Sequence, residues 1–122
     1  MRVLLGIEGS DESMLTLEKT IERAKQAGDE LTILVVEKDE AARSQSEVAE
    51  RAQTLVEEAQ LDAEVRTATG DPGSTLVDVA EREEFDQLAI GGGTQSPMGK
   101  IRLGPITEFV LLNANTTVKL VR

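Results

Sequence analysis

The chain has 122 residues, of which 39% are hydrophobic, and its 23 acidic and 13 basic residues give a formal net charge of -10. This length supports one domain around a single core, and the acidity, with no Trp or Tyr to stack on bases, argues against nucleic-acid binding. The absence of Cys and His excludes disulfides, thiolate and imidazole metal ligands, and catalytic triads that use an imidazole base.

The chain begins with a predicted strand–helix unit. Residues 2–8 form a mostly apolar run that is typical of a strand, and Gly9 allows the turn that follows. Ser10 is the expected N-cap of a helix, and Gly28 is expected to end it. The apolar residues of this segment recur at steps of three and four, which places them on one helix face: Met14, Leu17, Ile21 and Ala24.

The next elements continue the alternation. Residues 31–36 are a continuous apolar run, as expected for a strand covered on both faces. Ser44 and Glu47 have the spacing of a capping box, which predicts a second helix. A third strand is predicted over residues 63–69, and residues 71–72, Asp and Pro, suit the cap and first turn of a third helix.

The last third of the chain joins a short strand to a glycine-rich segment. The apolar residues 88–90 run into three glycines at 91–93, and Gly104 and Pro105 later open a fourth helix. A last strand is predicted over residues 117–121. Because strands and helices alternate throughout, the sequence predicts an α/β fold with a doubly wound parallel sheet.

The segment from residue 91 to Pro105 has the layout of a phosphate-binding loop. Glycines let the backbone turn or approach a ligand, and the free amides at a helix start attract an anion. The alternative is a tight strand exit followed by an ordinary helix that begins with proline. A Walker A loop is excluded because Gly99 and Lys100 are not followed by Ser or Thr.

Read as a whole, the chain resembles the universal stress protein family. The family signature is G-x2-G-x9-G-[ST]; Gly91 and Gly104 fill its first and third positions, while Thr94 and Pro105 stand where the pattern has Gly and Ser or Thr. The resemblance implies a single domain over residues 1–122. It also implies a five-stranded parallel sheet of order 3-2-1-4-5, with helices on both faces, of the adenine nucleotide α-hydrolase-like kind.

The resemblance further implies a site for ATP, ADP or AMP where the first, second and fourth strands end. Glu8 stands where the family usually has an Asp that reaches the adenosine part, and Val36 at the position whose backbone meets adenine. Glu8 has a second interpretation as a solvated strand-end carboxylate, and Lys100 and Arg102 are either phosphate-binding cations or solvated loop charges. The candidate site comprises Ile7, Glu8, Gly9, Ser10, Val36, Gly91, Thr94, Lys100, Arg102, Gly104, Pro105 and Ile106.

Pro105 bears on the phosphate end of this site. Proline has no amide hydrogen and replaces a hydroxyl donor, so up to two donors are lost at the helix start. A hydrogen bond to a charged group contributes roughly 1.5 to 3 kcal/mol, and the loss therefore predicts phosphate binding weakened by more than about tenfold.

These observations lead to a non-enzymatic stress-response module, with neither catalytic nor metal-binding residues, as the first functional hypothesis. The alternatives are a nucleotide-free interaction module of the same fold and a weak ATPase that uses Lys100 and Arg102.

With no apolar run of membrane-spanning length and no signal-peptide pattern, we expect a cytoplasmic location, and the acidity suggests a halophilic source. By the resemblance, the last strand lies at the sheet edge and predicts a homodimer through Thr117, Val118, Lys119, Leu120 and Val121.

Overall fold

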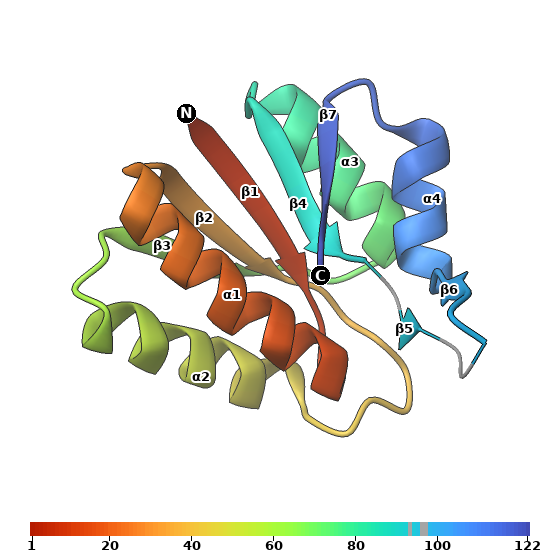
Figure 1. Cartoon of the computed structure of the whole chain (residues 1–122), viewed down its shortest axis with the longest axis horizontal. Helices are drawn as coiled ribbons and strands as arrows, with labels where there is room; N and C mark the ends of the chain where they lie inside the picture. Colours follow the sequence, from red (N-terminus) through yellow and green to blue (C-terminus); the bar gives the residue numbers. More distant parts are fainter. Residues whose placement is uncertain (93, 96–97) are drawn as a thin grey trace.

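The computed structural model describes residues 1–92, 94–95 and 98–122. Figure 1 shows a central sheet with helices on both faces. In chain order the elements are β1 (Arg2–Ile7), α1 (Asp11–Ala27), β2 (Glu30–Val35), α2 (Gln45–Glu58), β3 (Ala63–Thr67), α3 (Pro72–Arg82), β4 (Gln87–Gly91), β5 (Thr94–Gln95), β6 (Ile101–Arg102), α4 (Pro105–Asn113) and β7 (Thr117–Val121). The predicted strands and helices are confirmed, with bounds that differ by one or two residues at several ends.

The main sheet has the order β3-β2-β1-β4-β7, and all neighbouring strands in it are parallel. This is the predicted order 3-2-1-4-5, with β7 as the fifth strand. Helices α1 and α2 lie on one face and α3 and α4 on the other (Figure 1). Because consecutive parallel strands need a crossover, this winding places the carboxyl ends of all five strands along one edge.

The predicted helix caps are confirmed. Ser10 accepts a hydrogen bond from the amide of Ser13, and Ser44 and Glu47 form the complete capping box of α2. Asp71 accepts from the amide of Ser74 at the start of α3. Gly28 ends α1 at a φ of 72°, a left-handed conformation that glycine adopts without steric cost. Each cap satisfies backbone groups that the helix itself leaves unpaired.

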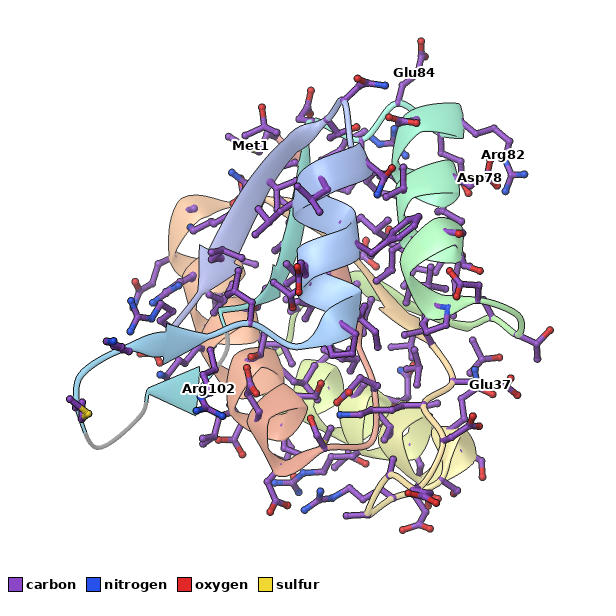
Figure 2. All side chains as sticks on the ribbon, turned by 90° about the vertical axis from the view of Figure 1, so that its right-hand side faces the viewer. Met1, Glu37, Asp78, Arg82, Glu84 and Arg102 are labelled. Atoms are coloured by element: carbon purple, nitrogen blue, oxygen red, sulfur yellow. The ribbon has the colours of Figure 1, made fainter. Side chains whose placement is uncertain are left out.

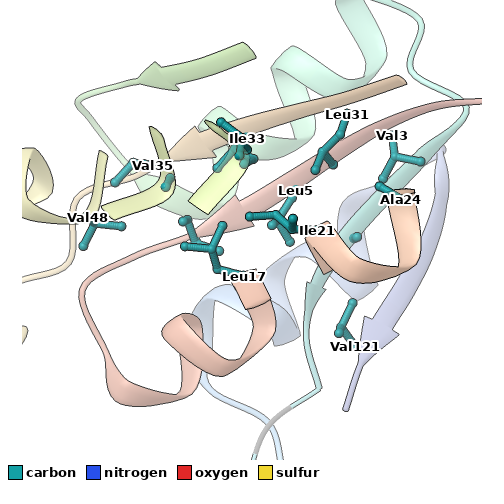
Figure 3. Close-up of a cluster of buried hydrophobic side chains, with 14 residues drawn as sticks. Val3, Leu5, Leu17, Ile21, Ala24, Leu31, Ile33, Val35, Val48 and Val121 are labelled. Carbon is teal, nitrogen blue, oxygen red and sulfur yellow. The ribbon is translucent and has the colours of Figure 1, made fainter. Parts of the chain in front are cut away.

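Two apolar clusters fill the space on either side of the sheet. Leu4 and Leu5 are adjacent in β1 and both fully buried, but they belong to opposite clusters because side chains alternate along a strand. The first cluster joins β1 and β2 to α1 and α2 (Figure 3). Its buried residues are Val3, Leu5, Ile7, Leu17, Ile21, Ala24, Leu31, Ile33, Val35, Val48, Ala52, Val56, Ala89 and Val121.

The fourth helix is buried on one side only. Val110 is fully buried, but Leu111 is 40% exposed and Leu112 is 77% exposed. A Cβ atom built on Gly73 of α3 would lie 2.7 Å from the ring of Phe109. Glycine at this position therefore lets α3 and α4 approach closely, and it is this contact that decides which side of α4 faces the core.

The segment predicted as a polar loop contains a short antiparallel hairpin, in which Thr94 pairs with Arg102 and Gln95 with Ile101. Sequence periodicity cannot detect strands of two residues. The strand before it also runs further than expected, because Gly91 belongs to β4 and the amide of Gly92 donates to the carbonyl of Val121 at 2.9 Å. Gly91 therefore continues the strand instead of turning the chain, and the other predicted role of these glycines, a close approach to a ligand, stays a prediction. Gly93 lies outside the described residues.

Candidate functional site

A cleft of about 800 Å³ lies at the carboxyl ends of the strands. Its floor comes from β1 and β4, and the starts of α1, α3 and α4 surround it. The lining comprises Gly6, Ile7, Glu8, Ser10, Glu12, Ser13, Val36, Glu37, Lys38, Asp39, Gly70, Asp71, Pro72, Gly73, Leu76, Ile90, Gly91, Gly104, Pro105, Ile106, Thr107 and Phe109. Volumes of roughly 300 to 1,000 Å³ are typical of small-molecule sites.

Most of the predicted site residues meet in this cleft: Ile7, Glu8, Ser10, Val36, Gly91, Gly104, Pro105 and Ile106. Three others do not line it, namely Gly9, Lys100 and Arg102. Lys100 and Arg102 are exposed, and Figure 2 shows Arg102 on the hairpin. The interpretation of these two residues as phosphate-binding cations stays a prediction. The side chain of Thr94 lies outside the described part of the chain.

The Glu8 carboxylate is engaged by the protein itself. Oε1 accepts from the Ser10 amide at 3.0 Å, from the Ser10 hydroxyl, and from the Ser13 hydroxyl at 2.7 Å. Oε2 forms an ion pair with Lys38 at 3.0 Å, and the Glu8 side chain is only 12% exposed. Burial raises the pKa of Glu8, but the hydrogen bonds from Ser10, Ser13 and Lys38 outweigh it and hold this pKa below its usual value. Of the two interpretations of Glu8, the solvated strand-end carboxylate is therefore wrong, and the contact with a ligand stays a prediction.

Gly9, which follows β1, and Gly91, at the end of β4, make room for neighbouring segments of the protein. A Cβ atom on Gly9 would overlap the carbonyl oxygen of Arg43 and lie 2.9 Å from the Ala41 side chain. A Cβ atom on Gly91 would lie 3.0 Å from the hydroxyl of Thr16, on α1. Both glycines therefore position neighbouring segments around the cleft.

The start of α4 is the part of the cleft most suited to an anion. Gly104 is its N-cap residue and supplies no side-chain hydrogen bond, and Pro105 occupies the first turn. The hydroxyl of Thr107 donates to the carbonyl of Gly91 at 3.1 Å and so ties α4 to the end of β4. The positive end of the helix dipole faces the cleft here, although Pro105 has no amide hydrogen to offer.

Sequence reasoning missed one wall of the cleft and most of its charged rim. Residues 70–73, at the start of α3, form that wall, and Glu12, Glu37, Lys38 and Asp39 contribute to the rim. The available signal was topological, because residues that follow any strand of a parallel sheet gather at the same edge.

Among the described residues, no group of three or more acidic side chains is placed to hold a metal ion. Within the same part of the chain, no helix is long and apolar enough to cross a membrane.

The chain is a doubly wound α/β domain, because crossover helices connect the parallel strands and the winding of the sheet reverses between β1 and β4. The cleft lies at this reversal, at the carboxyl edge of the sheet. Residues 1–122 match the model of the universal stress protein family, and the chain belongs to this family. None of the curated proteins matches the sequence.

Solved structures confirm the fold. A universal stress protein from Archaeoglobus fulgidus aligns with a TM-score of 0.76 at 23% identity, covering 100% of this chain and 98% of that one. A universal stress protein in complex with cAMP has a TM-score of 0.76 at 24% identity, with coverages of 100% and 96%. A family protein from Arabidopsis thaliana with AMP bound has a TM-score of 0.74 at 17% identity, with coverages of 99% and 90%.

Proposed function

We propose that this protein is a cytoplasmic stress-response module that binds an adenine nucleotide in the cleft between β1, β2 and β4. The observation that carries the proposal is the cleft itself, which lies where parallel α/β sheets bind ligands and has the volume of a small-molecule site. Related structures hold cAMP, AMP and, in a universal stress protein from Archaeoglobus fulgidus, dAMP. All three of these ligands carry adenine and one phosphate.

The walls of the cleft suit the two ends of such a ligand. Pro72, Ile106 and Phe109 are apolar lining residues that keep part of their surface exposed, and they offer contact to a planar base. The start of α4, without a side-chain cap, offers backbone amides to a phosphate. The chemistry of the lining therefore fits an adenine nucleotide.

Filling the cleft from Gly104 tests this proposal. A Cβ atom on Gly104 would meet nothing within 4 Å, and its φ of -73° accepts any residue. We expect wild-type protein to bind AMP in titration calorimetry and Gly104→Trp to bind it at least about tenfold more weakly, because the indole occupies the cleft.

Gly104→Ser is the matched control, since it adds little volume, and we expect it to bind AMP at least as tightly as wild type. Far-UV circular dichroism checks that both variants fold. Absence of AMP binding to wild-type protein would favour the nucleotide-free interaction module instead.

The proposed module is not an enzyme. The sequence has no His or Cys to serve as a base or nucleophile near neutral pH. Two of the carboxylates at the cleft have structural partners, because Glu8 binds Ser10, Ser13 and Lys38, and Asp71 caps α3. These contacts support a binding role over catalysis.

We also propose that two copies pair through β7, which forms the edge of the main sheet next to β4. The carbonyl of Val121 accepts from Gly92, so the backbone groups of Val121 and Lys119 face β4. Since backbone direction alternates along a strand, those of Val118 and Leu120 face outward. An antiparallel pair of these edges about a twofold axis would satisfy the outward groups.

Two proline substitutions test this dimer. We expect Val118→Pro to stay folded and become monomeric in light scattering, because proline is tolerated where the amide faces away from the sheet. Lys119→Pro removes an inward-facing amide and should instead lower the melting temperature. A monomeric wild type, or a Val118→Pro variant that remains dimeric, would contradict the proposed interface.

A further inference from the structure

The charged side chains that line the cleft are mostly acidic. Five carboxylates contribute to its surface, and among the described lining residues Lys38 is the one cation: the acids are Glu8, Glu12, Glu37, Asp39 and Asp71. The Lys38 ammonium lies 3.0 Å from Glu8 and is committed to that ion pair. Four carboxylates therefore have no cationic partner within the lining.

The cations expected from the sequence do not correct this imbalance. Arg102 belongs to the β5–β6 hairpin and is exposed, while Glu37 follows β2; Figure 2 shows the two on opposite sides of the view. Neither Lys100 nor Arg102 is among the residues that line the cleft. The lining itself thus supplies neither of these two cations to a ligand in the cleft.

The start of α4 has limited donors to hold an anionic group. Pro105 removes one amide, and no side chain at Gly104 adds a donor. The carboxylate of Glu12 lies close by, since its Oε1 is 3.3 Å from a Cβ position built on Gly91. A further phosphate beyond one held at the start of α4 would meet the Glu12 carboxylate first.

We propose that the cleft selects adenine ligands with no more than one phosphate and rejects polyphosphates by charge repulsion. This inference rests on the proposed function, because it concerns the same cleft. Like charges repel over the Debye length, which is about 8 Å at physiological ionic strength and shorter than that at high salt. The selectivity should therefore weaken as salt is added.

Calorimetric titrations with adenosine, AMP and ATP, all in EDTA without added metal, test the proposal. We expect AMP to bind at least about tenfold more tightly than ATP at about 10 mM KCl. Raising KCl to about 1 M, where the Debye length is about 3 Å, should strengthen ATP binding by about tenfold and change adenosine binding by less than about twofold. ATP that binds as tightly as AMP at low salt would overturn the inference and leave the proposed function intact.

Glu12→Gln isolates the charge. It should strengthen ATP binding by at least about threefold at low salt and leave adenosine binding unchanged. Glu22→Gln makes the same change on the exposed side of α1, about 15 Å further along the helix. It should strengthen ATP binding by less than Glu12→Gln does and leave adenosine binding unchanged. Equal effects of the two variants on ATP would overturn the inference. Failure of all three ligands to bind wild-type protein would overturn the proposed function and the inference together.

Discussion

Gly9→Ser is expected to destabilise the protein by about 3 kcal/mol or more, which corresponds to a fall in melting temperature of about 10 °C. The added Cβ would overlap the carbonyl oxygen of Arg43 and crowd the side chain of Ala41. A backbone oxygen cannot move aside by changing rotamer, so the whole segment before α2 must shift. Thermal unfolding followed by circular dichroism measures the effect.

The same substitution at Gly104 is the matched control. Its Cβ would meet nothing within 4 Å, and serine is a favourable N-cap residue for α4. We expect Gly104→Ser to be neutral or stabilising by a few tenths of a kcal/mol. Equal losses of stability at the two positions would show that steric overlap at Gly9 is not the cause.

Glu8→Gln is the second variant for which we expect a large effect. It replaces a carboxylate that accepts hydrogen bonds from Ser10 and Ser13 and pairs with Lys38. Hydrogen bonds to charged groups contribute roughly 1.5 to 3 kcal/mol each, and the neutral amide keeps part of this network, so a loss of about 2 to 3 kcal/mol at pH 7 is expected. Denaturant unfolding gives the free-energy difference directly.

The stability difference between wild type and Glu8→Gln should decrease as the pH falls. The pKa of Glu8 is lower in the folded protein than its usual value of 4.5, so folding favours the ionised form. Its contribution to stability is complete above the unfolded-state pKa and is lost as the pH falls through the folded-state pKa. The gap between wild type and variant should thus stay constant from pH 7 to about pH 5.5 and close below about pH 4.5.

Glu22→Gln serves as the control, because Glu22 is exposed on α1 and this variant should follow wild type at every pH. A gap between wild type and Glu8→Gln that widens on acidification would contradict the assigned role of the Glu8 carboxylate.

The amino-acid sequence alone was sufficient to predict the helices and the strands of the main sheet in chain order, but not the β5–β6 hairpin. The capping residues Ser10, Ser44 and Asp71 and the C-cap Gly28 all act as predicted, because a cap depends on residues within one turn of itself. The alternation of strands and helices led to the parallel sheet, and the family resemblance supplied its order. The place of the cleft followed from that order, since strand ends gather at one edge.

Contacts between distant parts of the chain decided what the residues in and around the cleft do. Gly9 was predicted as a turn residue, but its neighbour across the fold is Arg43, and Glu8 was paired by Lys38 from the end of β2. The hairpin carries Arg102 outside the cleft lining, while residues 70–73 bring in a wall from α3. Periodicity and capping report interactions within a few residues, whereas steric contact and charge pairing across a sheet depend on how its elements pack. The sequence patterns therefore determined where a site would form, and only the tertiary structure decided which side chains line it and what charge it presents.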